Sequence, residues 1–303
     1  MAKQITVDDS KVHGDWRDEL FQNGYVLVKN AISPARCEYY IDKMFQWLES
    51  FPFGFDRNDQ STWTEEHLLT YIKGGMYHGY RIQHEKFIWE ATTEDGVIEA
   101  FAKLWGTDKL LVSFDGMNFT LPSEGMQCIQ GILNFPPNGP QDGGLLVMEG
   151  SKRLLPEFFK THSGTIGCPT WGPSDWFGFD ESEVKWFEER GCEIHKVTAE
   201  PGDLILWDSR TMHFNCVPST QNLRAIIYAC YTPASFATPD VLQQKGENFD
   251  QRIGTTHWPR DNLSTETSHA NHPEEDKGDL TKHLYEEPIE TDLALKLAGK
   301  IPY

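Results

Sequence analysis

One histidine and one arginine have the residue types and the spacing of a small-molecule site. His213 follows the apolar run from Leu204 to Trp207, and Arg224 opens a second apolar run eleven residues after the histidine. We therefore expect a strand that ends by presenting an imidazole and a second strand that begins with a guanidinium. An imidazole is a common ligand of transition metals, and a guanidinium makes paired, charge-assisted hydrogen bonds to a carboxylate.

This pair suits two parts of the site of a non-haem iron oxygenase. Such an enzyme holds iron with two histidines and one carboxylate, which leaves room for a bidentate 2-oxo acid and for dioxygen. His213 suits the iron, and Arg224 suits the far carboxylate of 2-oxoglutarate. On these two residues alone, a packing histidine and a surface arginine are the alternative, so the surrounding sequence has to decide.

Several short motifs occur in one order along the chain, between about residues 14 and 259. They are WGTD at 105–108, SFDGMN at 113–118, QGILN at 130–134, NGP at 138–140, DGGL at 142–145, GS at 150–151 and WDSR at 207–210. Together they resemble the phytanoyl-CoA dioxygenase-like group of Fe(II) and 2-oxoglutarate enzymes, especially its fungal members. The resemblance implies a double-stranded β-helix, a jelly-roll or cupin-like fold, with the metal at its open mouth.

The resemblance also assigns roles to single residues. His213 resembles the distal iron ligand and is the expected catalytic residue. Arg224 resembles the 2-oxoglutarate clamp, and Gln130 a strand residue that faces this co-substrate. Fe(II) and 2-oxoglutarate are therefore the implied cofactors.

The sequence departs from this family at the remaining metal ligands. Relatives carry a His-x-Asp pair between two strands, but the corresponding connection at 119–126 holds no histidine and is shorter than the family's. Asp115 and Glu124 are weak candidates for a carboxylate ligand. The spellings His13-Gly14-Asp15 and His272-Pro273-Glu274 are similar to the missing pair, but both lie outside the strand region.

Three other side chains are candidates for the wall of a substrate pocket. His78 and His84 follow a glycine-rich connection and can approach the mouth of the fold, although packing is the plainer interpretation of both. Trp207 ends the strand before His213. Lys152 follows Gly150-Ser151, where relatives often have histidine.

The composition excludes several classes of function. The chain has 46 acidic against 27 basic residues and a formal charge of -19, so its surface repels nucleic acid and anionic membranes. The six cysteines show no Cys-x-x-Cys spacing and are expected to be reduced core thiols. No apolar signal segment or membrane-spanning run is present, which predicts a soluble, cytoplasmic protein with a small-molecule substrate.

The elements that must position these residues are a helical cover and a set of strands. Strands are expected at 24–28, 111–114, 127–135, 145–148, 192–197, 204–207 and 223–231, and helices from Ser33-Pro34 to about 51, at 97–105 before Gly106, at 156–161 and at 181–189. This pattern predicts one mainly β domain with helices over residues 1–260. Residues 261–303 are expected to form an acidic, polar tail that is draped on the surface or partly disordered.

Three functions stay open at this point. The first is a dioxygenase-like oxidoreductase of secondary metabolism that acts on a small, largely apolar metabolite with an incomplete or unusual iron site. The second is a catalytically silent homologue, a pseudoenzyme that serves as a ligand-binding module or as a subunit in a homo- or hetero-oligomer with an active homologue. The third is a metal-independent isomerase or cyclase in which His213 is the general base.

Overall fold

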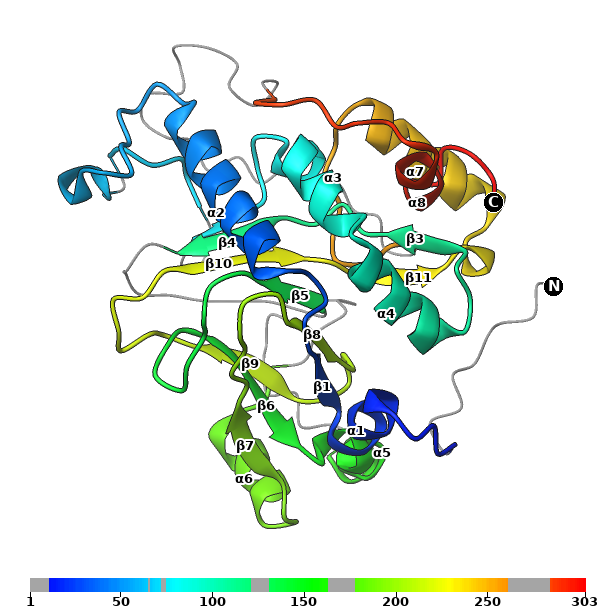
Figure 1. Cartoon of the computed structure of the whole chain (residues 1–303). Coiled ribbons are helices and arrows are strands. Elements are labelled where there is room, and N and C mark those ends of the chain that lie inside the picture. The colour runs from blue at the N-terminus through cyan, green and yellow to red at the C-terminus, as the bar shows by residue number, and fades with distance from the viewer. Residues whose placement is uncertain (1–10, 65, 72–74, 121–130, 163–177, 261–283) are drawn as a thin grey trace.

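The fold is built on a six-stranded antiparallel sheet that faces a three-stranded antiparallel sheet (Figure 1). A computed structural model describes residues 11–64, 66–71, 75–120, 131–162, 178–260 and 284–303. The large sheet has the order β1-β8-β5-β10-β4-β2, the small sheet has the order β7-β6-β9, and β11 pairs with β3. The strands are β1 Tyr25–Val28, β2 Met76–Tyr77, β3 Leu110–Val112, β4 Met117–Thr120, β5 Gly131–Asn134, β6 Gly144–Glu149, β7 Glu193–Lys196, β8 Leu204–Trp207, β9 His213–Cys216, β10 Arg224–Tyr228 and β11 Tyr231–Pro233.

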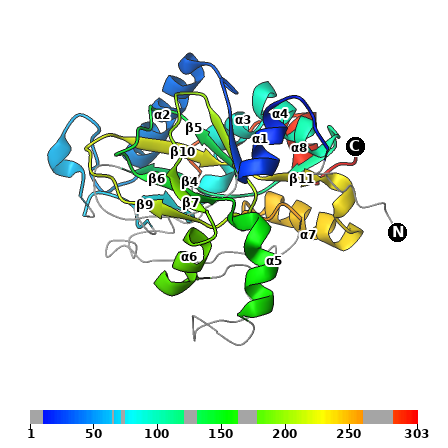
Figure 2. The same ribbon diagram turned by 90° about the horizontal axis from the view of Figure 1, so that it is seen from below.

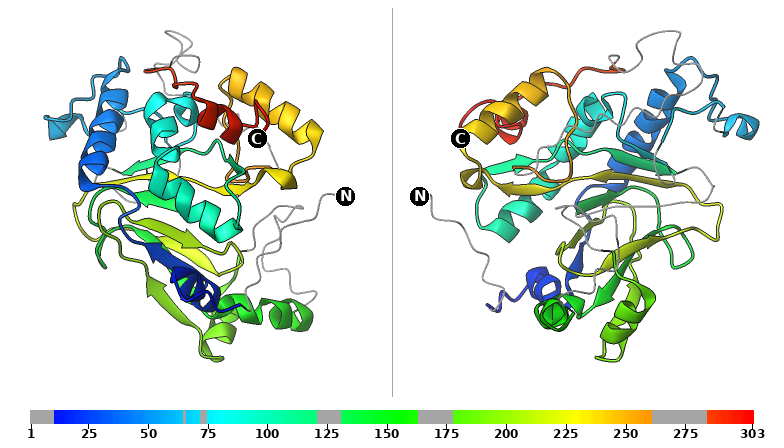
Figure 3. Two further views of the ribbon diagram at one scale, coloured as in Figure 1. Left: turned by 45° about the vertical axis from the view of Figure 1, so that its right-hand side comes forward. Right: turned by 180° about the vertical axis from the view of Figure 1, so that it is seen from behind.

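Helices cover the face of the large sheet that points away from the small sheet (Figures 1 and 3). Their apolar side chains meet those of Leu133, Leu206 and Ile227 in what we call the main core. The covering helices are α2, α3, α4, α7 and α8, whereas α1, α5 and α6 lie elsewhere. The helices are α1 Trp16–Asn23, α2 Pro34–Glu49, α3 Lys86–Thr92, α4 Asp95–Trp105, α5 Ser151–Thr161, α6 Glu181–Glu188, α7 Pro239–Asp250 and α8 Asp292–Leu297.

The first two helices expected from the sequence form where their capping residues place them. Ser33 accepts a hydrogen bond from the backbone N–H of Arg36 at the start of α2, and α4 ends at Gly106 in the left-handed region at φ 68°. Tyr40 and Trp47 of the expected apolar stripe are completely buried in the main core. The prediction of an amphipathic helix that covers the sheet is therefore confirmed.

The predicted strands are present as far as the structure describes them, but the long apolar run near 223–231 divides into two. Of the strand expected at 127–135, β5 covers Gly131–Asn134, and residues 127–130 lie outside the described residues. β10 pairs with β4 and β5, whereas β11 pairs with β3 in a separate sheet, because the chain changes sheets at residues 229–230. The spacing of apolar residues along the sequence did not predict helices α1, α3 or α7. The cover therefore takes helices from both ends of the chain instead of from the N-terminal part alone.

The last twenty residues belong to the folded structure. Helix α8 contacts β3, and its Leu297 is completely buried in the main core. The buried carboxylate of Glu85 accepts a 2.7 Å hydrogen bond from the backbone N–H of Tyr285. Of the tail expected from residue 261 onward, residues 284–303 are thus packed against the helical cover, and residues 261–283 lie outside the described residues.

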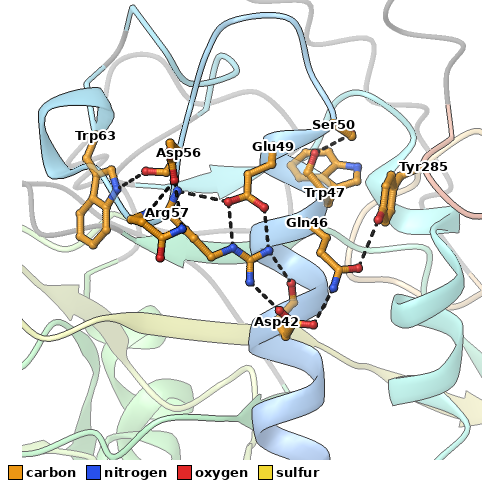
Figure 4. A network of polar contacts seen from close by, with 10 residues as sticks. Asp42, Gln46, Trp47, Glu49, Ser50, Asp56, Arg57, Trp63 and Tyr285 are labelled. Atoms are coloured by element: carbon orange, nitrogen blue, oxygen red, sulfur yellow. Dashed lines mark hydrogen bonds and ion pairs between the residues drawn. The ribbon is translucent and has the colours of Figure 1, made fainter.

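A polar network attaches α2 to the loop that follows it and to the C-terminal segment (Figure 4). Arg57 donates to Glu49 at 2.7 Å and forms an ion pair with Asp42 at 2.5 Å. Gln46 accepts a 3.1 Å hydrogen bond from the hydroxyl of Tyr285. Single exposed ion pairs stabilise a fold by at most about 1 kcal/mol, so the network mainly fixes how these segments lie against α2.

A second apolar cluster fills the space between the large and the small sheet, and we call it the inter-sheet core. Its members are Tyr25, Met76, Ile132, Leu145, Val147, Val197, Ala199, Ile205, Trp207, Ile226 and Tyr228. Since side chains alternate along a strand, any residue two positions away from a member points into the same space. This alternation decides which polar side chains reach the interior.

A third apolar cluster lies on the other side of the small sheet, next to α5 and α6 (Figure 2). Met148 of β6 meets Phe158 of α5 and Phe187 of α6 there. The guanidinium of Arg190 lies 3.7 Å from the centre of the Trp186 ring, at the exposed edge of this cluster. The cluster holds both helices against the small sheet and away from the inter-sheet core.

Two expectations from composition can be compared with the described residues. Cys37, Cys192 and Cys230 are free and buried, and Cys216 is free and half-buried, as expected for reduced thiols. No helix in the described ranges combines the length and apolar character needed to cross a membrane.

Replacement of Leu297 by alanine tests whether the C-terminal segment stabilises the domain. We expect Leu297→Ala to lower the free energy of unfolding by about 2–5 kcal/mol, because it leaves a cavity in the main core. The matched control Ile289→Ala removes a side chain that is 55% exposed and should change it by less than about 0.5 kcal/mol. Urea unfolding measures both, and equal effects would show that α8 is not part of the cooperative unit.

Candidate functional site

His213 projects into the inter-sheet core. Its backbone pairs with Val147, a member of that core, and residues opposite each other in an antiparallel ladder point to the same face. The His213 ring also lies 5.9 Å from that of Trp207, another member. The sequence predicted that His213 ends a strand, whereas the structure ends β8 at Trp207 and opens β9 with His213, because a turn intervenes.

Hydrogen bonding decides which nitrogen of His213 faces the site. Nδ1 lies 2.6 Å from the carbonyl oxygen of Thr211, which only accepts, so Nδ1 carries the proton. Burial lowers the pKa of the His213 imidazole, the bond to Thr211 opposes this effect, and the nearby His257 adds to the lowering. The neutral ring therefore keeps its lone pair on Nε2, the form in which histidine binds a metal or acts as a base.

Arg224 shares the inner face of the large sheet with members of the inter-sheet core. It lies two and four positions before Ile226 and Tyr228, so its side chain starts toward the small sheet. The side chain is half-buried and makes no hydrogen bond or ion pair with any residue that the structure describes. A guanidinium in this state is prepared for paired hydrogen bonds to a carboxylate.

His213 and Arg224 lie toward opposite ends of the inter-sheet core. Arg224 begins β10, and Tyr228 at the end of β10 lies in the same row of the large sheet as Ile205 of β8. Trp207, two positions further along β8, contacts His213. At about 3.4 Å per residue, the six positions from Arg224 to the row of Trp207 separate the two ends by roughly 20 Å, and the two side chains shorten this gap. We call the two ends the His213 end and the Arg224 end.

His78 and Asp115 form a buried pair at the His213 end of the large sheet. The Nε2 atom of His78 lies 3.0 Å from Oδ1 of Asp115, which also accepts a 2.7 Å hydrogen bond from the backbone N–H of Gly116. A Cβ atom at Gly116 would come within 2.8 Å of the His78 ring, so glycine allows the close approach. The sequence named both residues as candidates but did not predict that they contact each other.

His84 lies on the other side of the large sheet. Its ring is completely buried and packs 4.9 Å from that of Phe114, a member of the main core, and its Nε2 lies 2.9 Å from the carbonyl oxygen of Ile253. Burial lowers the pKa of His84 to about 3, although the bond to Ile253 opposes the shift. This environment is that of a packing histidine, and it separates His84 from His213.

The described residues do not complete an iron site around His213. They include no group of three or more His, Cys, Asp or Glu side chains that could hold a metal ion. Asp115 contacts His78, and the other weak carboxylate candidate, Glu124, and the expected co-substrate residue Gln130 lie outside the described residues. Within the described ranges, His213 is thus not accompanied by the two further ligands that the family uses.

Two positions discussed from the sequence have structural contacts. The side chain of Lys152 is 12% exposed and forms a 3.0 Å ion pair with Asp208. Asp15 caps α1 and forms a 2.9 Å ion pair with Arg17, which accounts for the His-x-Asp spelling at residues 13–15 without a metal.

Two side chains near the site were missed by the sequence interpretation. His257 follows α7 and lies close enough to His213 to influence its pKa. Lys196 ends β7 and lies close enough to Arg224 for the guanidinium to lower the pKa of the amine. Neither residue belongs to a family motif, and alternation along the strand at 192–197 gave no signal for Lys196, because its neighbour Val197 is the residue that points into the inter-sheet core.

These observations define a class of protein: two facing antiparallel sheets under a helical cover, with a histidine and an arginine directed between the sheets. Over 267 residues the chain is 43% identical to Ava biosynthesis cluster protein O of Aspergillus versicolor, covering 82% of this chain and 86% of the relative. It is 21% identical over 274 residues to a Dictyostelium discoideum protein whose name assigns it to the phytanoyl-CoA dioxygenases, covering 72% and 75%. The chain belongs to the phytanoyl-CoA dioxygenase-like family.

Other comparisons concern the family models and the fold. No protein-family model matches the chain. Among solved structures, the hypothetical protein JW0805 from Escherichia coli superposes with a TM-score of 0.55 at 12% identity, covering 86% of this chain and 79% of that one. This likeness shows a shared fold, and the family membership expected from the motifs is confirmed.

The environment of His84 predicts how stability depends on pH. The unfolded chain binds a proton at His84 below about pH 6.5, whereas the folded protein does not until about pH 3. The free energy of unfolding should therefore fall as the pH decreases from 6.5, by up to about 1.4 kcal/mol per pH unit from this group. His84→Gln keeps a hydrogen-bond donor for Ile253 but does not titrate, so urea unfolding between pH 7 and 4 should show a smaller slope. Identical slopes would contradict the assignment.

Proposed function

We propose that this chain binds 2-oxoglutarate between its two sheets and works in the biosynthesis of a small, largely apolar metabolite. The observation that carries the proposal is the state of Arg224: it is half-buried, starts toward the inter-sheet core and has no partner among the described residues. A five-carbon diacid presents a carboxylate to Arg224 while its 2-oxo acid group lies toward His213. Within the family, this is how the co-substrate is expected to lie.

The two facing sheets correspond, in this proposal, to the double-stranded β-helix of the family. The inter-sheet core is the interior of the roll, and the His213 end is its mouth. This correspondence is supported by the inward direction of His213 and Arg224, which belong to different sheets. It also explains why two residues from different sheets serve one ligand.

The substrate class follows from the walls of the site. Trp207 and Tyr228 are aromatic members of the inter-sheet core, and the indole N–H of Trp207 has no hydrogen-bond partner among the described residues. Such walls suit an apolar molecule with few polar groups. The relative from Aspergillus versicolor is named for a biosynthesis cluster, which supports a role in making a small molecule.

Oxidoreductase chemistry is the activity that we propose for this site. It requires iron, and His213 in its neutral form with Nε2 available suits one ligand position. Two further ligands have to come from outside the described ranges, where Glu124 is a candidate, or from a partner subunit.

The lack of a metal-binding group in the described ranges favours a second candidate function. A silent homologue keeps the fold and the ligand pocket but serves as a binding module or as the partner of an active subunit. A metal-independent isomerase or cyclase with His213 as general base is the third, and its activity would survive chelation.

The Arg224→Ala variant tests the co-substrate site. It should weaken the binding of 2-oxoglutarate by about 2–5 kcal/mol, because the ligand carboxylate loses its buried charge partner. Isothermal titration calorimetry on the metal-free protein measures this directly. Arg190→Ala removes a guanidinium from the edge of α6 and should leave the affinity unchanged; unchanged affinity in Arg224→Ala would refute the clamp.

Anaerobic loading with Fe(II) separates the candidate functions. If the chain is an oxidoreductase, Fe(II) with 2-oxoglutarate gives a metal-to-ligand charge-transfer absorption band and, after oxygen is admitted, succinate. We expect both signals in the wild type and neither in His213→Ala. Normal 2-oxoglutarate binding without either signal in the wild type would instead identify the silent homologue.

A further inference from the structure

A buried hydrogen-bond donor lies at the His213 end of the inter-sheet core. Trp207, the last residue of β8, is 5% exposed and belongs to this core. Its indole Nε1 atom has no hydrogen-bond acceptor in the part of the chain that the structure describes. A buried N–H group without an acceptor is rare in native proteins, because burial removes its hydrogen bonds to water. An acceptor on a bound molecule would satisfy this donor.

The polar groups around Trp207 have other partners. Tyr25, which lies opposite Trp207 in the register of β1 and β8, donates its hydroxyl to Oε1 of Glu149 at 3.0 Å. The carbonyl oxygen of Thr211 accepts a hydrogen bond from Nδ1 of His213 at 2.6 Å. None of these groups accepts a hydrogen bond from the indole. The described groups nearby therefore leave the indole N–H for a ligand.

Other tryptophans show what the fold provides for an indole N–H. Trp47 and Trp105 donate to oxygen atoms of the chain, at 3.2 and 2.8 Å. Trp89 also lacks an acceptor among the described residues, but it packs within the main core, where its ring meets that of Phe249 edge-on at 5.2 Å and 87°. Trp207 lies instead between the two sheets, in the space where we propose that the substrate binds.

His213 restricts the ligand group that can meet this N–H. The rings of Trp207 and His213 lie 5.9 Å apart and make an angle of 63°. In the proposed function Nε2 of His213 binds iron, so the indole N–H is the polar group that this pair of rings leaves for the substrate, and it can only donate. Because the indole is uncharged, it compensates a buried carboxylate poorly and suits a neutral acceptor. A carbonyl oxygen is such an acceptor.

We propose that Trp207 determines substrate specificity by donating a hydrogen bond from its indole N–H to a carbonyl oxygen of an otherwise apolar substrate. The apolar remainder of the substrate packs against members of the inter-sheet core. The inference rests on the proposed binding of an apolar metabolite beside His213, and it names the substrate class, a carbonyl compound. It assigns no contact with 2-oxoglutarate to Trp207.

Two probes of nearly the same shape test this hydrogen bond. They are acetophenone and α-methylstyrene, in which a methylene group replaces the carbonyl oxygen. Trp207→Phe keeps an aromatic ring but removes the N–H, so the affinity for acetophenone should fall by about 3- to 10-fold while that for α-methylstyrene stays unchanged. Titrations on the full chain, followed by NMR, measure both. Trp186→Phe, on α6 outside the inter-sheet core, is the control and should change neither affinity.

The results distinguish failure of this inference from failure of the proposed function. Equal weakening of both neutral probes by Trp207→Phe refutes the inference, since a ring that only shapes the pocket would act in this way. Absence of acetophenone binding to the wild type also overturns it. Weaker binding of 2-oxoglutarate to Trp207→Phe would assign the N–H to the co-substrate, which refutes the inference and leaves the proposed site intact. Failure of the wild type to bind 2-oxoglutarate overturns the proposed co-substrate site alone.

The indole proton of Trp207 gives an independent measure of the same contact. In the full chain with isotope-labelled tryptophan, its NMR signal is the one that Trp207→Phe removes. A hydrogen bond to a carbonyl oxygen deshields the proton, so acetophenone should move this signal downfield relative to its position with α-methylstyrene. The same position with both probes bound overturns the proposal, whatever the affinities are.

Discussion

Apolar contact between the two β-sheets is the interaction on which the candidate site depends. The inter-sheet core takes side chains from both sheets, and its burial fixes the distance and the register between them. Because side chains alternate along each strand, this register also directs His213 from the small sheet and Arg224 from the large sheet into the same space. A substitution that separated the two sheets would therefore move His213 and Arg224 apart, even if no polar residue were replaced.

The two ends of the inter-sheet core differ in the charge of their polar side chains. At the His213 end, burial lowers the pKa of the imidazole and so favours its neutral form, and the buried pair of His78 and Asp115 lies toward the same end of the large sheet, beside β2 and β4. At the Arg224 end, the guanidinium of Arg224 starts on the same face of β10 as Ile226 and Tyr228 and so brings positive charge toward the inter-sheet core. A ligand with a carboxylate at one end and a neutral metal-binding or reactive group at the other matches this division.

The helical cover supports the site from the opposite face of the large sheet. The main core binds the sheet to helices from both ends of the chain, and His84 belongs to this layer. Glu85 connects the cover to the C-terminal segment through the backbone at Tyr285. These contacts stabilise the sheet that carries Arg224 without entering the space between the sheets.

The sequence alone determined the family and most of the elements. Local signals were sufficient for both. Ser33-Pro34 marks the start of α2, and Gly106 marks the end of α4. The short motifs between residues 105 and 210, together with His213 and Arg224, indicate the family to which the relatives belong. Tertiary structure decided which residues meet. The contact of His78 with Asp115 and the packing of His84 in the other layer each join positions far apart in the chain. Such pairs depend on strand register and sheet order, which spacing along one chain does not encode.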